Sequence, residues 1–189
     1  VVEDHTERTV PPTFGEVLDI VDVQFQHNLA PIGMHALVWG AGYRYSVDRV
    51  RNSRYVAFLP ADLNQAWVSL FAQDELALRP DLRLTVGARL ERNDYTGMEV
   101  LPNARLAWTP APGHTLWGAL SRTVRAPSRF DRDIYVPGAP PFLLDGGSTV
   151  TSESARVAEF GYRGQPTATL SSSVTAFHAR YDDLRTQEV

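Results

Sequence analysis

The sequence predicts an all-β fold, an antiparallel up-and-down sheet of about eight strands. Three observations support this prediction. Apolar and polar residues alternate with a period of two, which is typical of amphipathic strands. Several alternating segments run well past the five or six residues that are usual in soluble sheets. The links between segments are alternately short and long, as in a sheet with tight turns at one end and loops at the other.

The alternation is clearest in the run LRLTVGARLE, where leucine, valine and alanine oppose Arg83, Arg89 and Glu91. The runs IVDVQFQ, LVWGAGYRYS, NARLAWT and VAEFGYR repeat the pattern. The one stretch with helical character, DELALRPDL, contains Pro80 and Asp81, which favour a turn. In chain order, the predicted strands cover residues 15–29, 35–48, 65–78, 82–95, 102–109, 114–126, 154–164 and 168–184.

The links differ in composition as well as in length. The short ones, NLAPIGMH, LRPDL, TPAPGH and RGQPTA, are rich in turn-forming residues. The longer ones are VDRVRNSRYVAFLPADLN, NDYTGMEVLP and the region around residues 128–153. This last link holds Pro137, Pro140, Pro141, Gly146 and Gly147. Pro127, which cannot donate to a strand ladder, marks the point where the preceding strand should end.

Two sheet architectures fit an alternation with a period of two. A membrane-spanning strand needs about 9–11 residues at its tilt. Outer-membrane barrels combine such strands with short periplasmic turns, longer extracellular loops and aromatic girdles. The strand lengths and the alternating links favour a transmembrane β-barrel, present as a partial wall, with its polar face lining the lumen. The alternative is a small complete β-barrel or β-sandwich that binds a ligand in solution and is not an enzyme.

Composition narrows the function classes. The chain has 189 residues, enough for one domain, and a net charge of -4, which argues against nucleic acid as the main partner. It has no cysteine, which excludes a disulfide scaffold, a thiolate metal site and a cysteine nucleophile. The first residues, VVEDHTERTV, contain no initiator methionine and are not a signal peptide, so we expect a fragment or a processed segment.

Enzymatic and cofactor-binding motifs are missing from the sequence. No serine lies in a GxSxG elbow, and the five histidines show no metal-binding spacing. The glycines of Gly40–Gly42 lack the rest of a dinucleotide fingerprint. Asp182 and Asp183 could act as paired carboxylates, but the end of a strand explains them more simply. The sequence therefore predicts neither an enzyme nor a cofactor.

Several runs together resemble the β-barrel of TonB-dependent outer-membrane receptors. In chain order they are VWGAGYRYS, SLFAQDELAL, LRLTVGARLERNDYTG, LPNARLAWTP, HTLWGALSRTVRAPSRFD, SESARVAEFGYRG and VTAFHARYDDL. They cover nearly the whole chain after residue 35. Within the family, the chain is most similar to receptors for iron–siderophore-type ligands.

The resemblance implies energised uptake of a scarce ligand at the bacterial outer membrane. In the family, an N-terminal plug closes a barrel of about 22 strands, and TonB acts through a short box ahead of the plug. Neither is in this sequence, so we expect residues 1–189 to form a partial barrel domain that lacks the plug and the remaining strands. The expected partners are outer-membrane lipid, a small ligand such as an iron chelate, and TonB only through the missing plug.

Three arginines follow one strand into the longest link. Arg122, Arg125 and Arg129 could face an anionic ligand or a lipopolysaccharide phosphate. They could instead pair with acidic residues of neighbouring strands, and Glu153 and Glu159 are natural partners. Because an arginine facing lipid at the midplane costs about 2–4 kcal/mol, we favour inward placement and structural pairing.

Other candidate residues belong to the same region. Arg163 is a further candidate for ion pairs in the lumen, together with Glu153 and Glu159. Tyr135 and Phe142 lie in the longest link and are candidates for aromatic contacts with a ligand; a solvated loop is the alternative. Because structural pairing is favoured for the arginines, charge reversal at Arg122 or Arg125 should disturb assembly more than ligand affinity.

Overall fold

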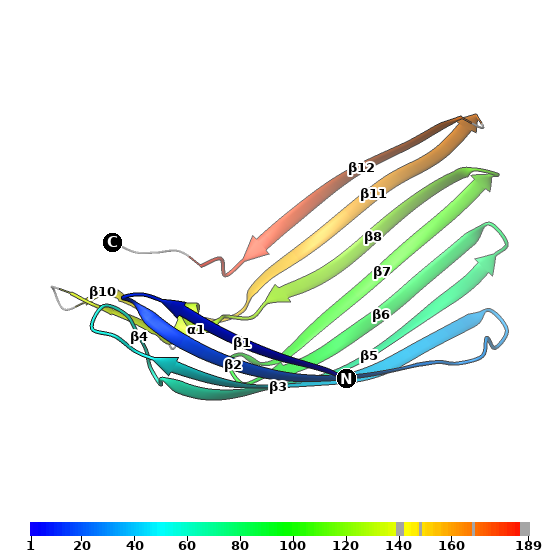
Figure 1. The fold of residues 1–189 in the computed structure, drawn as a ribbon. Helices are drawn as coiled ribbons and strands as arrows, with labels where there is room; N and C mark the ends of the chain where they lie inside the picture. Colours follow the sequence, from blue (N-terminus) through cyan, green and yellow to red (C-terminus); the bar gives the residue numbers. More distant parts are fainter. Residues whose placement is uncertain (139–141, 148, 168, 186–189) are drawn as a thin grey trace.

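The computed structural model describes residues 1–138, 142–147, 149–167 and 169–185. Nine strands form one antiparallel sheet in the order β1-β2-β3-β5-β6-β7-β8-β11-β12 (Figure 1). Their bounds are Val2–Val10 (β1), Phe14–Asn28 (β2), His35–Arg51 (β3), Asp62–Arg79 (β5), Leu82–Asn93 (β6), Gly97–Ala111 (β7), His114–Arg125 (β8), Glu153–Thr167 (β11) and Leu170–Asp182 (β12). The expected up-and-down, all-β architecture is confirmed.

A second, smaller sheet lies at the end of the wall that carries the long links. It has the order β10-β9-β4 and joins β4 (Ala57–Phe58), β9 (Ile134–Pro137) and β10 (Phe142–Asp145). A short helix, α1 (Arg129–Arg132), precedes β9. We call this small sheet, together with α1, the rim. Figure 1 shows it at the opposite end from the tight turns that follow β5, β7 and β11.

Three regions differ from the sequence expectation. Residues 2–10 form β1, although every residue of β1 is exposed and its apolar pattern is weak; pairing with β2 defines it. The expected long link NDYTGMEVLP is mostly strand, because Gly97, with φ 75°, closes a tight turn and begins β7. The link of residues 128–153 carries α1, β9 and β10. Pro140, Pro141 and Ala168 lie outside the described residues.

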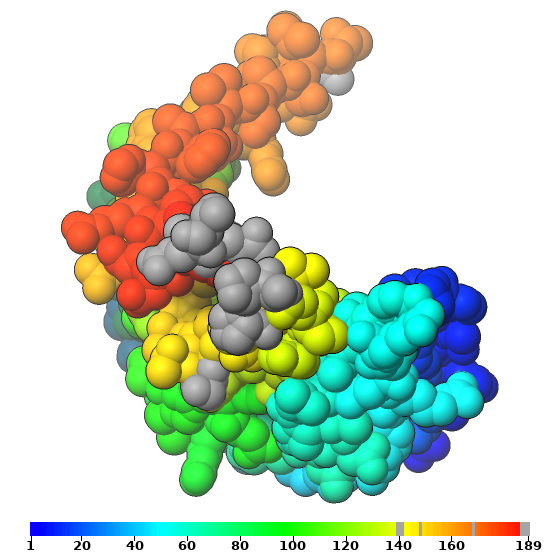
Figure 2. Space-filling model, turned by 90° about the vertical axis from the view of Figure 1, so that its left-hand side faces the viewer, coloured from blue at the N-terminus to red at the C-terminus, as the bar shows by residue number. Residues whose placement is uncertain are grey.

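The register gives the large sheet two chemically different faces. On β6, Leu84, Val86 and Leu90 share a face with the apolar residues opposite them on β5 and β7. We call this the outer face. The opposite, inner face carries polar side chains, several of them buried, namely Ser46, Asp48, Gln65, Ser69 and Asn93. Figure 2 shows the sheet curving into an arc that is open on one side, with the yellow part of the β8–β11 link on its inner side.

The outer face is apolar and exposed to its surroundings. Many of its large side chains are between 37% and 66% exposed, namely Phe25, Leu37, Trp39, Val68, Leu70, Leu90, Leu106, Trp108, Leu120, Phe160 and Val174. A soluble sandwich would bury this face, so the arrangement is that of a barrel wall in lipid. The part of the chain that the structure describes contains no helix of the length and apolarity needed to cross a membrane.

The large sheet is open. Its order begins at β1 and ends at β12, and the described residues of these two strands do not pair with each other. A small closed barrel is therefore not formed. The buried hydrophobic side chains of the described chain, Val50, Phe58 and Ile134, cluster where the rim meets β3.

Candidate functional site

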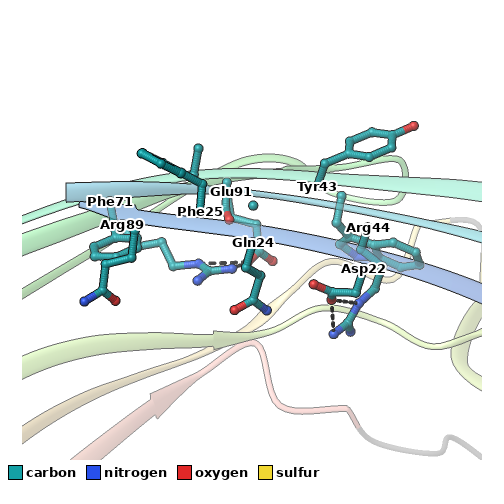
Figure 3. A pocket seen from close by; sticks show the side chains of 13 residues that line it. Asp22, Gln24, Phe25, Tyr43, Arg44, Phe71, Arg89 and Glu91 are labelled. Carbon is teal, nitrogen blue, oxygen red and sulfur yellow. Dashed lines mark hydrogen bonds and ion pairs between the residues drawn. The ribbon is translucent and has the colours of Figure 1, made fainter. Parts of the chain in front are cut away.

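A polar groove of about 320 Å³ lies on the inner face between β2, β3, β5 and β6. Figure 3 shows Asp22 and Arg44 turned toward each other on this face, whereas Tyr43 points to the other side of the sheet. The inner-face residues that line the groove are Asp22, Gln24, Gln26, Gly42, Arg44, Trp67, Ser69, Phe71, Arg89 and Glu91. Alternation on four adjacent strands brings them together, because every second residue of each strand points inward.

The charges of the groove are paired. Arg44 donates from Nε to Asp22 at 2.7 Å, and the Arg89 Nη2 atom lies 3.2 Å from the Glu91 carboxylate. Both arginine side chains remain about half exposed, so their remaining donors reach the open space. The groove therefore offers donors and acceptors to a polar solute without a large net charge.

An aromatic side chain and two glycines shape the floor of the groove. A Cβ atom at Gly40 would lie 2.5 Å from the Phe71 ring, and one at Gly42 would lie 2.9 Å from the Ser69 hydroxyl. These glycines of β3 thus leave room for β5 side chains on the inner face. The sequence expectation that the small residues of this strand make room inside the wall agrees with these distances.

Arg129 joins the rim to the wall. Its side chain is 9% exposed, and its guanidinium contacts Asp48 on β3 at 2.9 Å and Asp133 at 3.1 Å. It also donates to the carbonyl oxygens of Pro60 and Ala61. Burial by itself would lower the pKa of Arg129, but the hydrogen bonds to Asp48 and Asp133 outweigh it and raise that pKa.

Asp131 is the centre of a second buried cluster. It is 3% exposed and accepts hydrogen bonds from the Ser128 backbone N–H at 2.7 Å and from the Ser128 hydroxyl at 2.9 Å. Arg125 lies 3.2 Å away, and Arg185 also pairs with it. Burial would raise the pKa of Asp131, but the Ser128 bonds and the two arginines together hold it below its ordinary value.

A third rim contact involves the turn between β6 and β7. The Tyr95 hydroxyl donates to Asp133 at 2.5 Å, and Arg132 donates to the Tyr95 carbonyl oxygen. Burial is the larger cause and this bond to Asp133 the second, and both raise the pKa of Tyr95 above its ordinary range. The tyrosine therefore stays a neutral donor.

The structure brings some predicted site residues together and keeps others apart. Arg125 lies 3.2 Å from Glu153. Arg122 contacts Glu99 at 3.4 Å and the Val100 carbonyl oxygen at 2.6 Å, both on β7, and it does not contact Glu159. The register of β8 and β11 puts Arg122 on the outer face, so the inward placement expected from the sequence is wrong for this residue.

Arg163 and Glu159 lie apart from these ion pairs. Both are inner-face residues of β11, and neither has an ion-pair partner within the described ranges. Arg163 instead lines a small inner-face depression with Arg105 and Trp117.

The two candidate aromatic residues lie on neighbouring strands of the rim. Tyr135 on β9 and Phe142 on β10 have ring centroids 6.2 Å apart, and Phe142 is 40% exposed. Tyr135 is half-buried, so Phe142 is the more accessible ring of the pair.

Sequence reasoning missed the acidic residues that bind the arginines of the rim. Asp48 on β3 is 81 positions away from Arg129, and Asp133 lies inside a link with no clear pattern. Asp131 did have a signal, because an acidic residue three positions after a serine predicts a capped helix start. The structure has that capping box at Ser128.

A family model described as "TonB dependent receptor-like, beta-barrel" matches residues 6–189. The iron-regulated outer membrane virulence protein of Vibrio cholerae is 27% identical over 164 residues, which cover 84% of this chain and 24% of that protein. The chain thus spans about a quarter of the length of the curated relatives it matches.

Solved structures share the fold at low sequence identity. The siderophore receptor PirA from Pseudomonas aeruginosa has a TM-score of 0.75 at 19% identity, over 95% of this chain and 34% of the receptor. The ferric enterobactin receptor PfeA of the same organism, as a G324V mutant, gives 0.76 at 20% identity, over 88% and 27%. The copper transporter OprC gives 0.66 at 16%, over 93% and 32%.

Proposed function

Because this chain belongs to the TonB-dependent receptor family, as part of its β-barrel, we propose that it forms one stretch of the wall of a receptor that takes up a scarce ligand, such as an iron–siderophore complex, with energy supplied through TonB. The chain is a segment of a non-enzymatic outer-membrane β-barrel. The observation that carries the proposal is a sheet whose outer face is apolar and exposed and whose inner face carries a polar groove.

We propose that further strands, outside residues 1–189, pair with the two edges of this wall portion. The open sheet has β1 and β12 as its edges, and unpaired edges in lipid leave backbone groups unsatisfied. The chain covers about a quarter to a third of the length of these relatives, and we propose that further strands of the full-length protein complete the wall. We assign residues 1–189 to a partial barrel domain, and the contact with TonB to a plug outside these residues.

Ligand contacts are proposed at two levels of the wall. At the rim, Tyr135 and Phe142 offer ring faces to the ligand as it arrives from outside. Deeper, the groove around Asp22 and Arg44 offers polar contacts on the path through the lumen. Arg125 and Arg129 hold the rim in place through their ion pairs, in keeping with the structural role favoured from the sequence.

Uptake by cells tests the proposal. We expect that deleting the gene for the full-length protein abolishes import of radiolabelled iron bound to one siderophore class, and that loss of TonB abolishes the same import. Ferric catecholates, ferric hydroxamates and copper complexes form the ligand panel, because solved structures of this fold include siderophore receptors and a copper transporter. Unchanged import of every ferric siderophore would contradict the proposal.

Single substitutions at the rim test the aromatic contacts. Tyr135→Ala and Phe142→Ala should each raise the ligand Kd about three- to tenfold, as expected for a lost aromatic contact. Leu59→Ala, directly after β4 at a residue that is 57% exposed, is the matched control and should leave the Kd unchanged. Equal effects of all three substitutions would show that rim integrity, rather than ring contact, sets the affinity.

A further inference from the structure

Three arginines lie in register on three neighbouring strands of the outer face. Arg122 on β8 is directly opposite Arg156 on β11, and Arg156 is directly opposite Arg180 on β12. We call them the arginine row. They share their face with Leu120 and Phe160, which are 63% and 60% exposed. The row is therefore on the apolar, membrane-facing side of the wall and not in the lumen.

The row lies close to the end of the wall that carries the long links. Arg156 is three residues from the start of β11, and Arg180 is two residues from the end of β12. Since a strand rises about 3.3 Å per residue and is tilted, the row is at most about 10 Å below the strand ends. Because the long loops of outer-membrane barrels are extracellular, we place the row at the level of the outer leaflet headgroups.

Like charges directly opposite each other destabilise an antiparallel pair, so the row needs negative charge nearby. Two of its members have an acidic neighbour: Arg122 lies 3.4 Å from Glu99, and Arg180 lies 3.3 Å from Asp182. For the exposed central residue, Arg156, the described part of the chain supplies no acidic partner. One positive charge in the middle of the row is left without a counter-charge.

A groove of about 570 Å³ accompanies the row. It is lined by the three arginines, His178 and small or apolar residues, namely Pro102, Ala104, Leu120, Val157 and Ala158, with Asn103 and Ser121. Pro102 has no N–H to donate, and the paired register between β7 and β8 ends at Asn103 and Ser121. Above that point the Arg122 guanidinium takes the Val100 carbonyl oxygen as its acceptor.

We propose that the arginine row binds the phosphate group of a phosphorylated lipid of the outer leaflet, with the acyl chains along Leu120 and Phe160. A guanidinium donates in a planar fork that matches phosphate oxygens, and the groove places apolar surface directly below the charges. Glu99 and Asp182 already engage Arg122 and Arg180, so Arg156 is the main donor to the phosphate. The inference rests on the outer-membrane location of the wall and not on the identity of the transported ligand.

Lipid binding by the full-length protein tests the inference. Native mass spectrometry of the delipidated protein in detergent would compare diphosphorylated lipid A with its dephosphorylated form. We expect the phosphorylated lipid to bind at least tenfold more tightly. Arg156→Gln should weaken this binding roughly tenfold, and Arg180→Gln should weaken it less because Asp182 already engages Arg180. Arg156→Lys should weaken lipid binding less, because lysine keeps the positive charge but lacks the planar fork of guanidinium donors.

The controls separate the possible results. Arg83→Gln removes an inner-face arginine that pairs with Glu75 at 3.0 Å and should leave lipid binding unchanged. Heat-modifiable mobility on gels identifies variants that assemble. Equal binding of both lipids, or equal binding by the wild type and Arg156→Gln, would overturn the inference. Displacement of the lipid by excess inorganic phosphate would overturn the lipid assignment and indicate a free-anion site.

Discussion

The rim and the wall are stabilised in different ways. At the rim, Phe58 and Ile134 pack against Val50, and the buried Arg129 and Asp131 bind several partners each. In the wall, the large apolar side chains point outward and are exposed, and neighbouring strands are joined by long backbone ladders. Side-chain packing positions the rim, whereas backbone pairing and the surrounding lipid position the wall. Substitutions should therefore act locally at the rim and according to face in the wall.

The largest expected effect is at the rim. Arg129→Ala leaves Asp48 and Asp133 buried without their partner, which should lower the free energy of opening the rim by about 3–5 kcal/mol. Hydrogen exchange of the Leu59 and Gly146 amides, which donate to the Asp133 and Ile134 carbonyls, reports this opening. Arg54→Ala, an exposed substitution in the link between β3 and β4, should change it by less than about 0.5 kcal/mol. A uniform loss of protection through the wall would contradict the distinction between the two regions.

The next effect tests the two faces of the wall. Val86→Arg places a charge on the outer face in the middle of β6 and should destabilise the barrel by about 2–4 kcal/mol. Thr85→Arg, one residue away on the inner face opposite Glu75, should change the stability by less than about 1 kcal/mol. Reversible unfolding of the full-length barrel in lipid vesicles measures both. Similar losses for the two variants would show that the faces are not in different environments.

A smaller effect concerns close packing on the inner face. A Cβ atom at Gly161 would lie 2.4 Å from the Trp117 ring, so Gly161→Ala should destabilise the wall by about 1–3 kcal/mol. The added substitution Trp117→Ala should relieve the clash, since the closest atoms all belong to that ring. Gly118→Ala, whose nearest atom is 3.6 Å away, is the matched control. Absence of rescue in the double variant would exclude the ring as the cause.

The smallest effect is a pH dependence confined to the rim. The pKa of Asp131 is lowered in the folded protein, so its carboxylate stabilises the rim above the unfolded pKa of about 3.9. That stability is lost as the pH falls through the lower folded value. Limited proteolysis of the rim should therefore accelerate below about pH 4, and Asp131→Asn should remove most of this dependence. Identical acid profiles for the variant and the wild type would assign the effect to another group.

Much of the wall could be predicted from the sequence. Alternation located β2, β3, β5, β6, β8 and β11 to within a few residues, because each strand has one face in lipid and one toward the lumen. β1 was missed because its residues are polar on both faces, so only its partner strand defines it. β7 began earlier than expected, since the turn at Gly97 is shorter than its polar composition indicates.

The rim could not be predicted in the same way. β4 has two residues, and its partner β9 is far away in the sequence, so no local pattern exists for either. Arg129 and Asp48 are 81 positions apart in the sequence, so no local pattern relates them. By contrast, the pair of Arg125 and Glu153 links the end of one strand to the start of the next strand in the sheet, which is why sequence reasoning could name both partners.

The orientation of the wall can be tested most directly by cysteine scanning along β6. The chain contains no cysteine, so single substitutions at residues 83–90 introduce one defined label site each within it. In the full-length receptor in vesicles, labels at Leu84, Val86 and Leu90 should be quenched by lipid-soluble quenchers. Labels at Arg83, Thr85 and Arg89 should instead react with membrane-impermeant reagents. Strict alternation is the result we predict, and equal or inverted accessibility of the two sets would contradict a membrane wall with a polar inner face.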